Sequence, residues 1–278
     1  MNKPLVTVVV ATRNNRKTLD ACLASIINQT YERVELIVVD RDSTDGTRDI
    51  ARFYTQKVFC SGPERCAQRN FGAAKAQGEF VAMIDSDMEL TPHVIQDCVD
   101  TMYYHHNTKG IIIPEESFGK GFWAACKRLE RSYYHGNDAI EAARFFTKET
   151  YDQVGGYDES LISGEDWDLS ARVRELGPIE RVCSVIRHNE GKLKLWYSLR
   201  KKFYYARIAR VYLRKHKDTG RVLGGGIGVV SRYRLFLSRP KKLLANPLLG
   251  VGMLFMKTCE FGFGGIGYLL PKGKRERA

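Results

Sequence analysis

Short apolar runs alternate with segments of helical spacing along the first part of the chain. The runs are rich in β-branched residues, which is typical of strands buried on both faces of a parallel sheet. We predict strands at 5–11 (LVTVVVA), 34–39 (VELIVV), 58–59 and 79–84 (EFVAMI), with helices at 16–29, 45–57 and 64–77, the last ended by Gly78. This alternation predicts an α/β fold with a right-handed, doubly wound, mostly parallel sheet flanked by helices.

The middle of the chain has a more mixed pattern. Acidic residues in the first turn favour a helix start at 165. We predict helices at 92–106, 119–135 and 165–176, strands at 110–113 and 182–187, and a turn at Gly155-Gly156.

The pattern changes after residue 191. Residues 192–217 are predicted to form one long helix with an apolar side (Trp196, Leu199, Phe203, Ala206, Val211) and a cationic side (Arg200, Lys201, Arg207, Arg210, Arg214). Residues 222–230 and 243–270 are Gly-rich and apolar. Because Lys257 and Glu260 lie near the middle of the second stretch, it is a poor spanning helix. It fits better as segments lying in a membrane interface.

Charge divides the chain at the same place. From Gly191 to the end there are 21 Lys and Arg against 3 Asp and Glu, a net +18, so the first 190 residues carry −6 of the overall +12. We therefore predict a catalytic domain at 1–191 and a basic region at 192–278. Such a region can meet nucleic acid, anionic lipid or a phosphorylated substrate. The apolar stretches favour an anionic membrane over nucleic acid, and the alternative is packing on the catalytic domain or a homodimer interface.

The seven cysteines include no CxxC pair. Their odd number indicates reduced, mostly buried thiols. The first apolar run is too short for a signal sequence, and no cleavage pattern follows it. The predicted location is therefore cytoplasmic, peripheral or monotopic on the inner face of the cell membrane.

Polar clusters follow three of the predicted strands, at the edge where parallel sheets bind their ligands. They are Thr12-Arg13-Asn14, Asp40-Arg41-Asp42 and Asp85-Ser86-Asp87. Carboxylates suit Mg²⁺ or Mn²⁺, and such an ion grips diphosphate oxygens. The alternative for the third cluster is a solvated turn.

Other single residues have both a functional and a structural interpretation. Asp40 can accept a hydrogen bond from a base or a ribose, whereas Asp42 and Asp45 fit a turn and a helix cap. Arg69 can contact a phosphate or a base, or be a solvated surface residue. The Glu165-Asp166 pair suits a general base or a cap.

His188 follows a predicted strand and is either a metal ligand or a structural histidine.

These motifs together resemble the inverting family 2 glycosyltransferases with the GT-A fold, of the membrane-associated type. The resemblance runs from about Leu5 to about Gly191 and rests on VTVVVATRNN, VELIVVDRDSTDGT, RNFGAAKAQGEFVAMIDSD, VGGYDE, SGEDWDLSARV and HNEG. It implies a nucleotide-sugar donor and a divalent ion, Mn²⁺ or Mg²⁺. The roles it implies are Asp166 as catalytic base, Asp87 and His188 as metal ligands, and Ala11, Thr12, Arg13, Asp40, Arg69, Asp85, Ser86 and Glu165 at the nucleotide sugar.

Two positions depart from the family pattern. Arg13 stands where an aromatic residue often stacks on the base, and Arg41 interrupts an Asp-Asp-Gly or Asp-Asn-x loop. The identity of the base is therefore open, with a preference for UDP from Asp40 and Arg69.

The predicted function is an inverting transfer of a sugar from a nucleoside diphosphate to a hydroxyl of a lipid-linked saccharide. Transfer to a polyprenyl phosphate is the nearest alternative, and it needs no base. A nucleotidyltransferase lacks support because ATRNN contains no glycine, and a dehydrogenase because no GxGxxG follows the first strand. A non-catalytic nucleotide-binding scaffold would not need so complete an acidic set.

Overall fold

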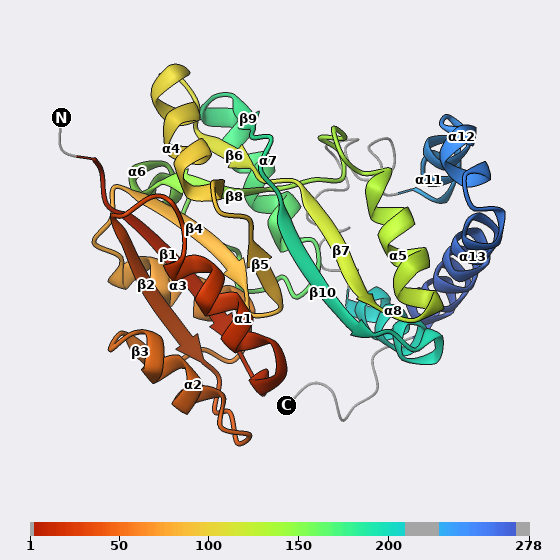
Figure 1. Cartoon of the computed structure of the whole chain (residues 1–278), viewed down its shortest axis with the longest axis horizontal. Coiled ribbons are helices and arrows are strands. Elements are labelled where there is room, and N and C mark those ends of the chain that lie inside the picture. Colours follow the sequence, from red (N-terminus) through yellow and green to blue (C-terminus); the bar gives the residue numbers. More distant parts are fainter. Residues whose placement is uncertain (1–2, 209–227, 271–278) are drawn as a thin grey trace. The chain divides into compact units, whose positions relative to one another are not determined.

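The computed structural model describes residues 3–208 and 228–270, which divide into two compact units (Figure 1). Unit 1 comprises Met1–Glu116, Glu141–Glu159 and Glu165–Asn189, and unit 2 comprises Ser117–Ile140, Ser160–Gly164 and Glu190–Ala278. Unit 2 thus takes two inserts from the middle of the sequence. The functional boundary predicted between 191 and 192 stays a prediction.

A seven-stranded sheet forms the centre of unit 1, in the order β3-β2-β1-β4-β8-β6-β9. Its strands are β1 (Val6–Thr12), β2 (Val34–Asp40), β3 (Val58–Cys60), β4 (Phe80–Asp85), β6 (Gly110–Ile112), β8 (Ala143–Thr147) and β9 (Ile179–Arg181). The first four are mutually parallel, and only β8 runs against its neighbours β4 and β6. The predicted α/β fold with a mostly parallel sheet is confirmed.

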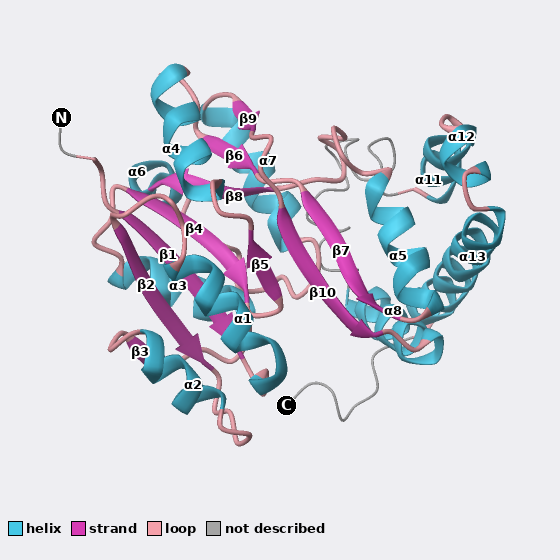
Figure 2. Ribbon diagram, viewed as in Figure 1, coloured by secondary structure: helices cyan, strands magenta, loops and turns pink. Residues whose placement is uncertain are grey.

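Helices cover both faces of this sheet, as Figure 2 shows by colour. The helices of unit 1 are α1 (Arg16–Ile27), α2 (Thr47–Tyr54), α3 (Arg65–Lys75), α4 (Val94–Tyr104), α6 (Lys148–Gln153) and α7 (Glu165–Leu176). Alternate residues of β1 separate two cores: Val8 packs with α1 and α4, and Val9 packs with α3 and α7. All seven residues of β1 are buried, which explains its run of mainly apolar, β-branched residues.

Helix α3 approaches the sheet closely because it carries a glycine at the contact. A Cβ at Gly72 would lie 2.3 Å from Val9 Cγ1. The helix ends at Lys75, with Ala76 already extended, so Gly78 does not end it as predicted. Instead the Gly78 amide donates to the Thr7 hydroxyl at 2.9 Å, at the entrance to β4.

A second, three-stranded sheet has the order β5-β10-β7. Its strands are β5 (Met88–Leu90), β7 (Glu115–Lys120) and β10 (Ile186–Lys192). The predicted strand 182–187 is therefore displaced, and His188 lies within β10 and not after it. Neither β7 nor β8 is predicted by the sequence pattern, and the helix predicted from 119 begins only at 122.

Apart from the ends of β7 and β10, the described secondary structure of unit 2 is helical. It contains α5 (Phe122–Ser132), α8 (Leu195–Ile208), α11 (Val229–Leu237), α12 (Pro240–Leu244) and α13 (Pro247–Leu269). The predicted long basic helix is observed as α8, while its remainder with Arg210, Val211 and Arg214 lies outside the described residues, as does 222–227. Residues 243–270, predicted as separate segments, instead contain one continuous 23-residue helix.

None of the helices in the described part of the chain combines the length and hydropathy needed to cross a bilayer.

The seven cysteines are free, and Cys22, Cys66, Cys98 and Cys126 are buried, as predicted for most of them.

Candidate active site

The ends of three parallel strands lie level at one edge of the large sheet. Thr12 of β1 pairs in register with Asp40 of β2, and Ala11 of β1 pairs with Asp85 of β4. The three polar clusters singled out in the sequence therefore meet at one edge of unit 1, where the arrows of β1, β2 and β4 end (Figure 2). This is the edge at which parallel α/β sheets bind ligands.

Arg69 on α3 is the centre of a buried ionic network at this edge. Its guanidinium is fully buried, and it donates to Asp85 Oδ1 at 2.5 Å and to Asp166 Oδ1 at 3.1 Å. The same group lies 3.8 Å from Glu165 Oε1 and 4.8 Å from the centre of the Tyr157 ring. The alternative of a solvated surface arginine is therefore wrong. Arg69 joins the end of β4 to the start of α7.

Asp166 is the most open carboxylate of this network. Its side chain is 25% exposed, against 18% for Asp85. Oδ1 accepts hydrogen bonds from Arg69 and from the Tyr157 hydroxyl at 3.0 Å, while Oδ2 lies 3.8 Å from Arg144 Nη2. One oxygen is thus held in place by two donors. The other has only a longer-range cation beside it among the described residues.

The pKa values of Asp85 and Glu165, the two acidic neighbours of Asp166, are shifted in opposite directions. Burial by itself would raise the pKa of Asp85, but the charges of Arg69 and Arg144 outweigh it and hold that pKa well below its usual value. Burial, followed by the charge of Asp166, raises the pKa of Glu165 although Arg65 donates to it at 2.7 Å. Carboxylates whose environments push their pKa values apart are characteristic of catalytic sites.

Arg144 and Glu115 belong to the same network and were missed by the sequence reasoning. Arg144 on β8 donates to Glu115 Oε1 at 2.9 Å and lies 3.6 Å from Asp85 Oδ2. Glu115 begins β7 and lies just beyond the predicted strand 110–113, so a carboxylate after a strand was a usable signal. Arg144 had no comparable signal, because it occurs inside a strand that the pattern does not predict.

Asp87 and His188 form a second group at this edge. His188 Nε2 lies 3.4 Å from Asp87 Oδ2, and His188 Nδ1 lies 3.4 Å from Glu115 Oε2. The two predicted metal ligands are thus neighbours, brought together because β10 pairs with β5 directly after Asp87. Within the described residues, no cluster of three or more histidine, cysteine or acidic side chains has the arrangement of a complete metal site.

This pair fits a divalent ion that takes its remaining ligands from a diphosphate. A carboxylate and an imidazole are ligands that Mn²⁺ accepts, and carboxylates suit Mg²⁺. The Asp87 side chain is 36% exposed and thus open to a ligand. Glu115 on the other ring nitrogen is the kind of partner that orients a metal-binding histidine.

Asp40 lies apart from the ionic network. It is fully buried, and its two oxygens accept from the Ser43 amide at 2.8 Å and the Ser43 hydroxyl at 2.5 Å. Asp45 accepts from the Thr47 amide at the start of α2, as the structural interpretation expected, although Gly46 occupies the cap position itself. The structure thus brings Asp40 to the right edge but not into contact with Asp85.

The remaining predicted site residues lie at the same edge of the sheet, some buried and one exposed to solvent. Ala11, Thr12 and Ser86 are buried, and Arg13 is exposed. Ser86 accepts from the Asn15 side chain at 2.5 Å. The Thr12 hydroxyl is buried and has no hydrogen-bond partner among the described residues, so it can serve a polar ligand.

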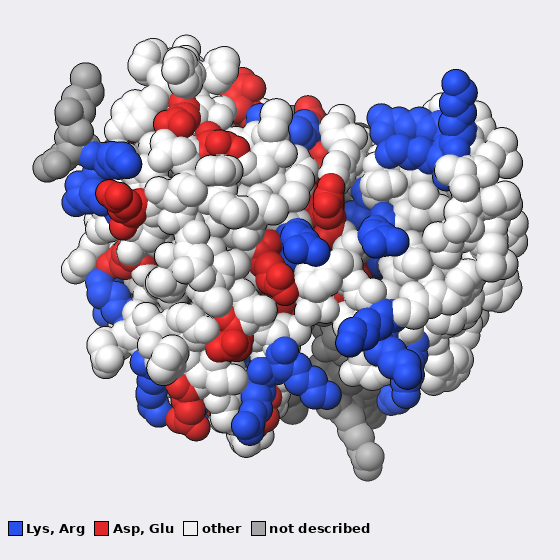
Figure 3. All heavy atoms as spheres, viewed as in Figure 1, with Lys and Arg blue, Asp and Glu red and all other residues white. Residues whose placement is uncertain are grey.

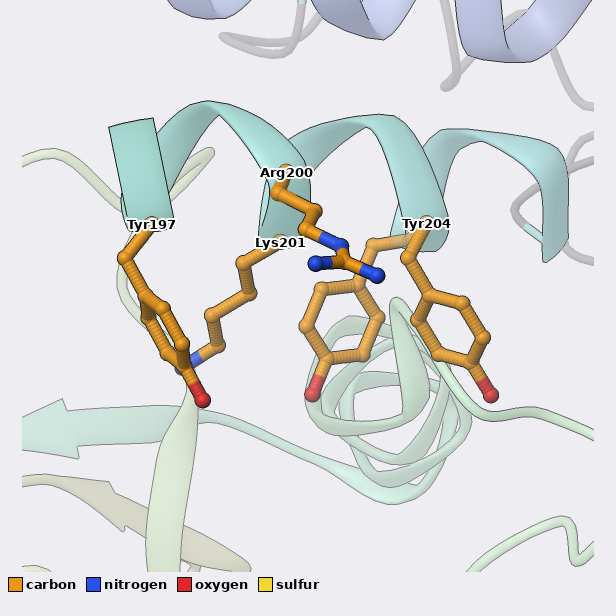
Figure 4. A pocket seen from close by; sticks show the side chains of 5 residues that line it. Tyr197, Arg200, Lys201 and Tyr204 are labelled. Carbon is orange, nitrogen blue, oxygen red and sulfur yellow. The ribbon is translucent and has the colours of Figure 1, made fainter. Parts of the chain in front are cut away.

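Unit 2 has a pocket of its own along α8. It has a volume of about 500 Å³ and is lined by Tyr197, Arg200, Lys201, Tyr204 and Tyr205. These residues recur at helical spacing, and Figure 4 shows the four labelled side chains extending from one side of α8. Lys201 Nζ lies 5.9 Å from the centre of the Tyr205 ring. The pocket therefore combines aromatic faces with two cations.

The glycosyl transferase family 2 model matches residues 7–151 of the chain. Glycosyltransferase GlyA of Streptococcus pneumoniae is 27% identical over 233 residues, which cover 81% of this chain and 32% of GlyA. The chain thus spans about a third of that relative's length. GalNAc(5)-diNAcBac-PP-undecaprenol beta-1,3-glucosyltransferase of Campylobacter jejuni is 24% identical and covers 99% of this chain and 85% of its own.

Among solved structures, the mannosyltransferase PcManGT from Pyrobaculum calidifontis in complex with GDP-Man and Mn²⁺ superposes with a TM-score of 0.65. It is 15% identical, and the match covers 98% of this chain and 89% of that one. This likeness shows that the two chains share the GT-A fold.

Proposed function

Because this chain belongs to glycosyl transferase family 2, we propose that it transfers a sugar from a nucleoside diphosphate donor to an acceptor hydroxyl, with inversion at the sugar C1. The observation that carries the proposal is the carboxylate of Asp166. Arg69 and Tyr157 hold one of its oxygens, and it lies beside Asp85 at the ligand edge of the sheet. The placement of a part-exposed carboxylate among fixed donors suits a general base.

In the proposed step Asp166 Oδ2 accepts the proton of the acceptor hydroxyl. The acceptor oxygen forms a bond to C1 while the bond from C1 to the diphosphate oxygen breaks, and that electron pair leaves with the nucleoside diphosphate. Arg69 and Tyr157 keep Asp166 oriented by their bonds to Oδ1. Asp85 and Ser86 would meet the ribose and phosphates, with Ala11, Thr12 and Arg13 along the nucleotide.

Asp87 and His188 would hold the divalent ion, Mn²⁺ or Mg²⁺, which when bound neutralises charge on a diphosphate. Glu115, 3.4 Å from the other ring nitrogen, would keep His188 turned toward Asp87.

The sequence predicted that Arg69 contacts the nucleotide sugar, and the role proposed here is a different one. Its guanidinium is fully buried among carboxylates, which supports a positioning role for Asp85 and Asp166 over direct contact with a base. Glu165, held by Arg65, would support the same network. The preference for a UDP-sugar then rests on Asp40 alone, and the GDP-Man of PcManGT is the alternative to test.

For the acceptor we propose a lipid-linked saccharide. The name of the Campylobacter relative describes a glycan on an undecaprenol diphosphate. The α8 pocket offers aromatic faces for sugar rings and two cations for phosphate. A polyprenyl phosphate is the alternative acceptor, and it needs no base. Asp166→Asn separates the two, because it should abolish transfer to a hydroxyl but spare transfer to a phosphate.

The proposed location is the cytoplasmic face of the cell membrane, where such acceptors are held. Its support in this chain is the net +18 carried from Gly191 to the end.

A panel of UDP-, GDP- and dTDP-sugars with Mn²⁺ tests the donor site. Sugar donors of one of these nucleotide classes should raise the melting temperature of the protein and be slowly hydrolysed by it. The reason is that the donor is proposed to bind at this edge of the sheet. Asp87→Ala and His188→Ala should each lower the affinity for Mn²⁺ by at least the roughly 10- to 100-fold that loss of an outer partner of a ligand costs, and with it the metal-dependent rise in melting temperature. Asp49→Ala, at a carboxylate whose side chain is 80% exposed on α2, is the matched control.

The donor proposal would be contradicted if no nucleotide sugar shifted the melting temperature, or if Asp49→Ala weakened binding as much as Asp87→Ala.

A further inference from the structure

One face of α13 is fixed inward by small residues. A Cβ at Gly252 would lie 2.4 Å from Phe122 Cζ, and one at Gly267 would lie 2.4 Å from the Phe203 carbonyl oxygen. Larger side chains at these two positions would therefore push the helix away from α5 and α8, against which it packs. The glycines decide which side of α13 faces the core of unit 2.

Both charged residues of α13 lie on that inward side. Lys257 donates to Glu260 at 2.8 Å and lies 2.5 Å from Glu130 Oε1 on α5. Lys127 donates to Glu130 at 2.9 Å and lies 3.9 Å from Glu260. Because the only charges of this 23-residue helix are used inside, none is left for its outer surface.

The opposite side of α13 is apolar and exposed. Positions three or four residues apart share a helix face, so the outer residues form two apolar groups along one side of α13, with the exposed Thr258 and Gly262 between them. The outer stripe consists of Leu248, Val251, Phe255, Ile266 and Leu269, which are 71, 68, 54, 54 and 77% exposed. Exposed apolar side chains gathered on one side of a surface helix indicate an interaction site.

Cations border the stripe on the neighbouring short helices. Arg234 on α11, Arg239 and Lys241 are exposed and form no ion pair with a described carboxylate. Leu237 and Leu244 lie exposed among them. In Figure 3 blue atoms gather over α11 and α12, whereas the surface over α13 is white.

We propose that the outer stripe of α13 and this basic border dock unit 2 on an anionic lipid surface, with α13 lying along the interface. Apolar side chains would enter the acyl boundary while the cations meet the head groups, the arrangement of interfacial helices. This inference rests on the membrane location proposed above and names the surface responsible for it, while docking itself requires no step of the transfer reaction.

Charge favours lipid over a second copy of the chain. A twofold contact through the stripe would place the same patch on both partners. The basic borders of the two copies would then face each other, which is unfavourable. Anionic head groups provide the complementary charge.

Vesicle flotation of the full chain tests the proposal. We expect binding to vesicles of phosphatidylcholine and phosphatidylglycerol, weakened by salt and much lower on phosphatidylcholine alone. The double variant Val251→Glu/Phe255→Glu should reduce bound protein at least tenfold. Arg239→Glu/Lys241→Glu should reduce it on the anionic vesicles specifically. Phe53→Glu, at a residue 85% exposed on α2 in unit 1, is the matched control and should bind normally.

Three results would overturn the proposal. One is unchanged flotation of both double variants. Another is equal loss with Phe53→Glu. The last is a dimer in solution that Val251→Glu/Phe255→Glu dissociates while vesicle binding is absent in the original chain. Circular dichroism identifies a folding defect, in which case Leu248→Ser/Leu269→Ser replaces the first double variant. Asp166→Asn should still float, so failure of docking and failure of catalysis are separable.

Discussion

Both units bury charged side chains, but they do so in different ways. In unit 1 the fully buried Arg69 joins Asp85, Asp166 and Glu165, and Asp166 keeps a quarter of its side chain exposed. In unit 2 Lys127 and Lys257 face Glu130 and Glu260, with side-chain exposures of 14, 8, 1 and 2%. The first network thus keeps a carboxylate open to solvent, whereas these two lysines and two glutamates of the second are nearly closed to it.

The electrostatics of the two groups differ accordingly. In unit 2 burial opposes the charges of Glu260 and Lys257, yet opposite charges outweigh it, lowering the pKa of Glu260 to about 2 and raising that of Lys257. Burial of its ammonium group, followed by the charge of Lys127, lowers the pKa of the nearby Lys202 to about 8. In unit 1 the pKa of Asp85 is lowered but that of Glu165 is raised. Buried groups whose burial is offset by opposite charges indicate a structural role. Neighbouring carboxylates whose pKa values are shifted in opposite directions indicate a catalytic site. The comparison predicts that variants in the unit 1 network lose turnover, whether or not they also lose stability, whereas variants in the unit 2 cluster lose stability alone.

The largest effect is expected from Arg69→Met. It leaves three carboxylates without their buried cation, and such losses cost about 3–5 kcal/mol of unfolding free energy. Turnover should fall as well, because Asp166 loses a donor to Oδ1. Chemical denaturation and a transfer assay measure both.

Arg65→Met is the control, since Arg65 is 43% exposed and forms its ion pair with Glu165 at 2.7 Å. It should cost no more than about 1 kcal/mol. Equal destabilisation by Arg69→Met and Arg65→Met would contradict the central role of Arg69 in the network.

Lys257→Met should come next, at about 3 kcal/mol, since Lys127 still faces both glutamates. Donor hydrolysis per folded molecule should not change, because this cluster lies in unit 2. Urea unfolding beside the exposed Lys17→Met control measures the cost. A loss of hydrolysis in the folded variant would break the distinction between the two regions.

Acid should weaken unit 2 through Glu260. Its pKa is lowered from 4.5 to about 2 on folding, so its stabilisation is present above about 4.5 and is lost as pH falls toward 2. Glu260→Gln should flatten the pH dependence of unfolding in this window. An unchanged slope in that variant would show that Glu260 does not carry the effect.

The smallest effect concerns the α8 pocket. Arg200→Ala/Lys201→Ala should raise the KM for a lipid-linked saccharide about tenfold and leave the donor KM unchanged, because charge-assisted contacts to phosphate are lost. Steady-state kinetics with Lys75→Ala as an exposed-lysine control provide the measurement. A shift in donor KM alone would count against an acceptor role.

The parallel core of unit 1 could be predicted from the sequence because β1, β2 and β4 are mainly apolar and each ends at a polar cluster. Asp40 and Asp85 were placed at the correct edge for this reason. Arg144 was missed because β8 is short and holds an arginine, so only its neighbours β4 and β6 define it as a strand.

Unit 2 was harder to predict for a different physical reason. Lys257 and Glu260 look like interruptions of an apolar stretch when only local sequence is considered. Lys257 pairs with Glu130 on α5, and Glu260 lies 3.9 Å from Lys127 on the same helix, far away in the chain, so these pairings exist only after folding. The single helix α13 therefore could not be inferred from hydropathy alone.

The role of Asp166 is tested most directly by Asp166→Asn, assayed for donor binding and transfer in the same preparation. The account predicts unchanged stability, unchanged nucleotide-sugar affinity with Mn²⁺, and transfer to a hydroxyl reduced by about 10²- to 10⁴-fold. Glu159→Gln is the matched surface control. Near-normal transfer by Asp166→Asn would contradict the assignment of the catalytic base.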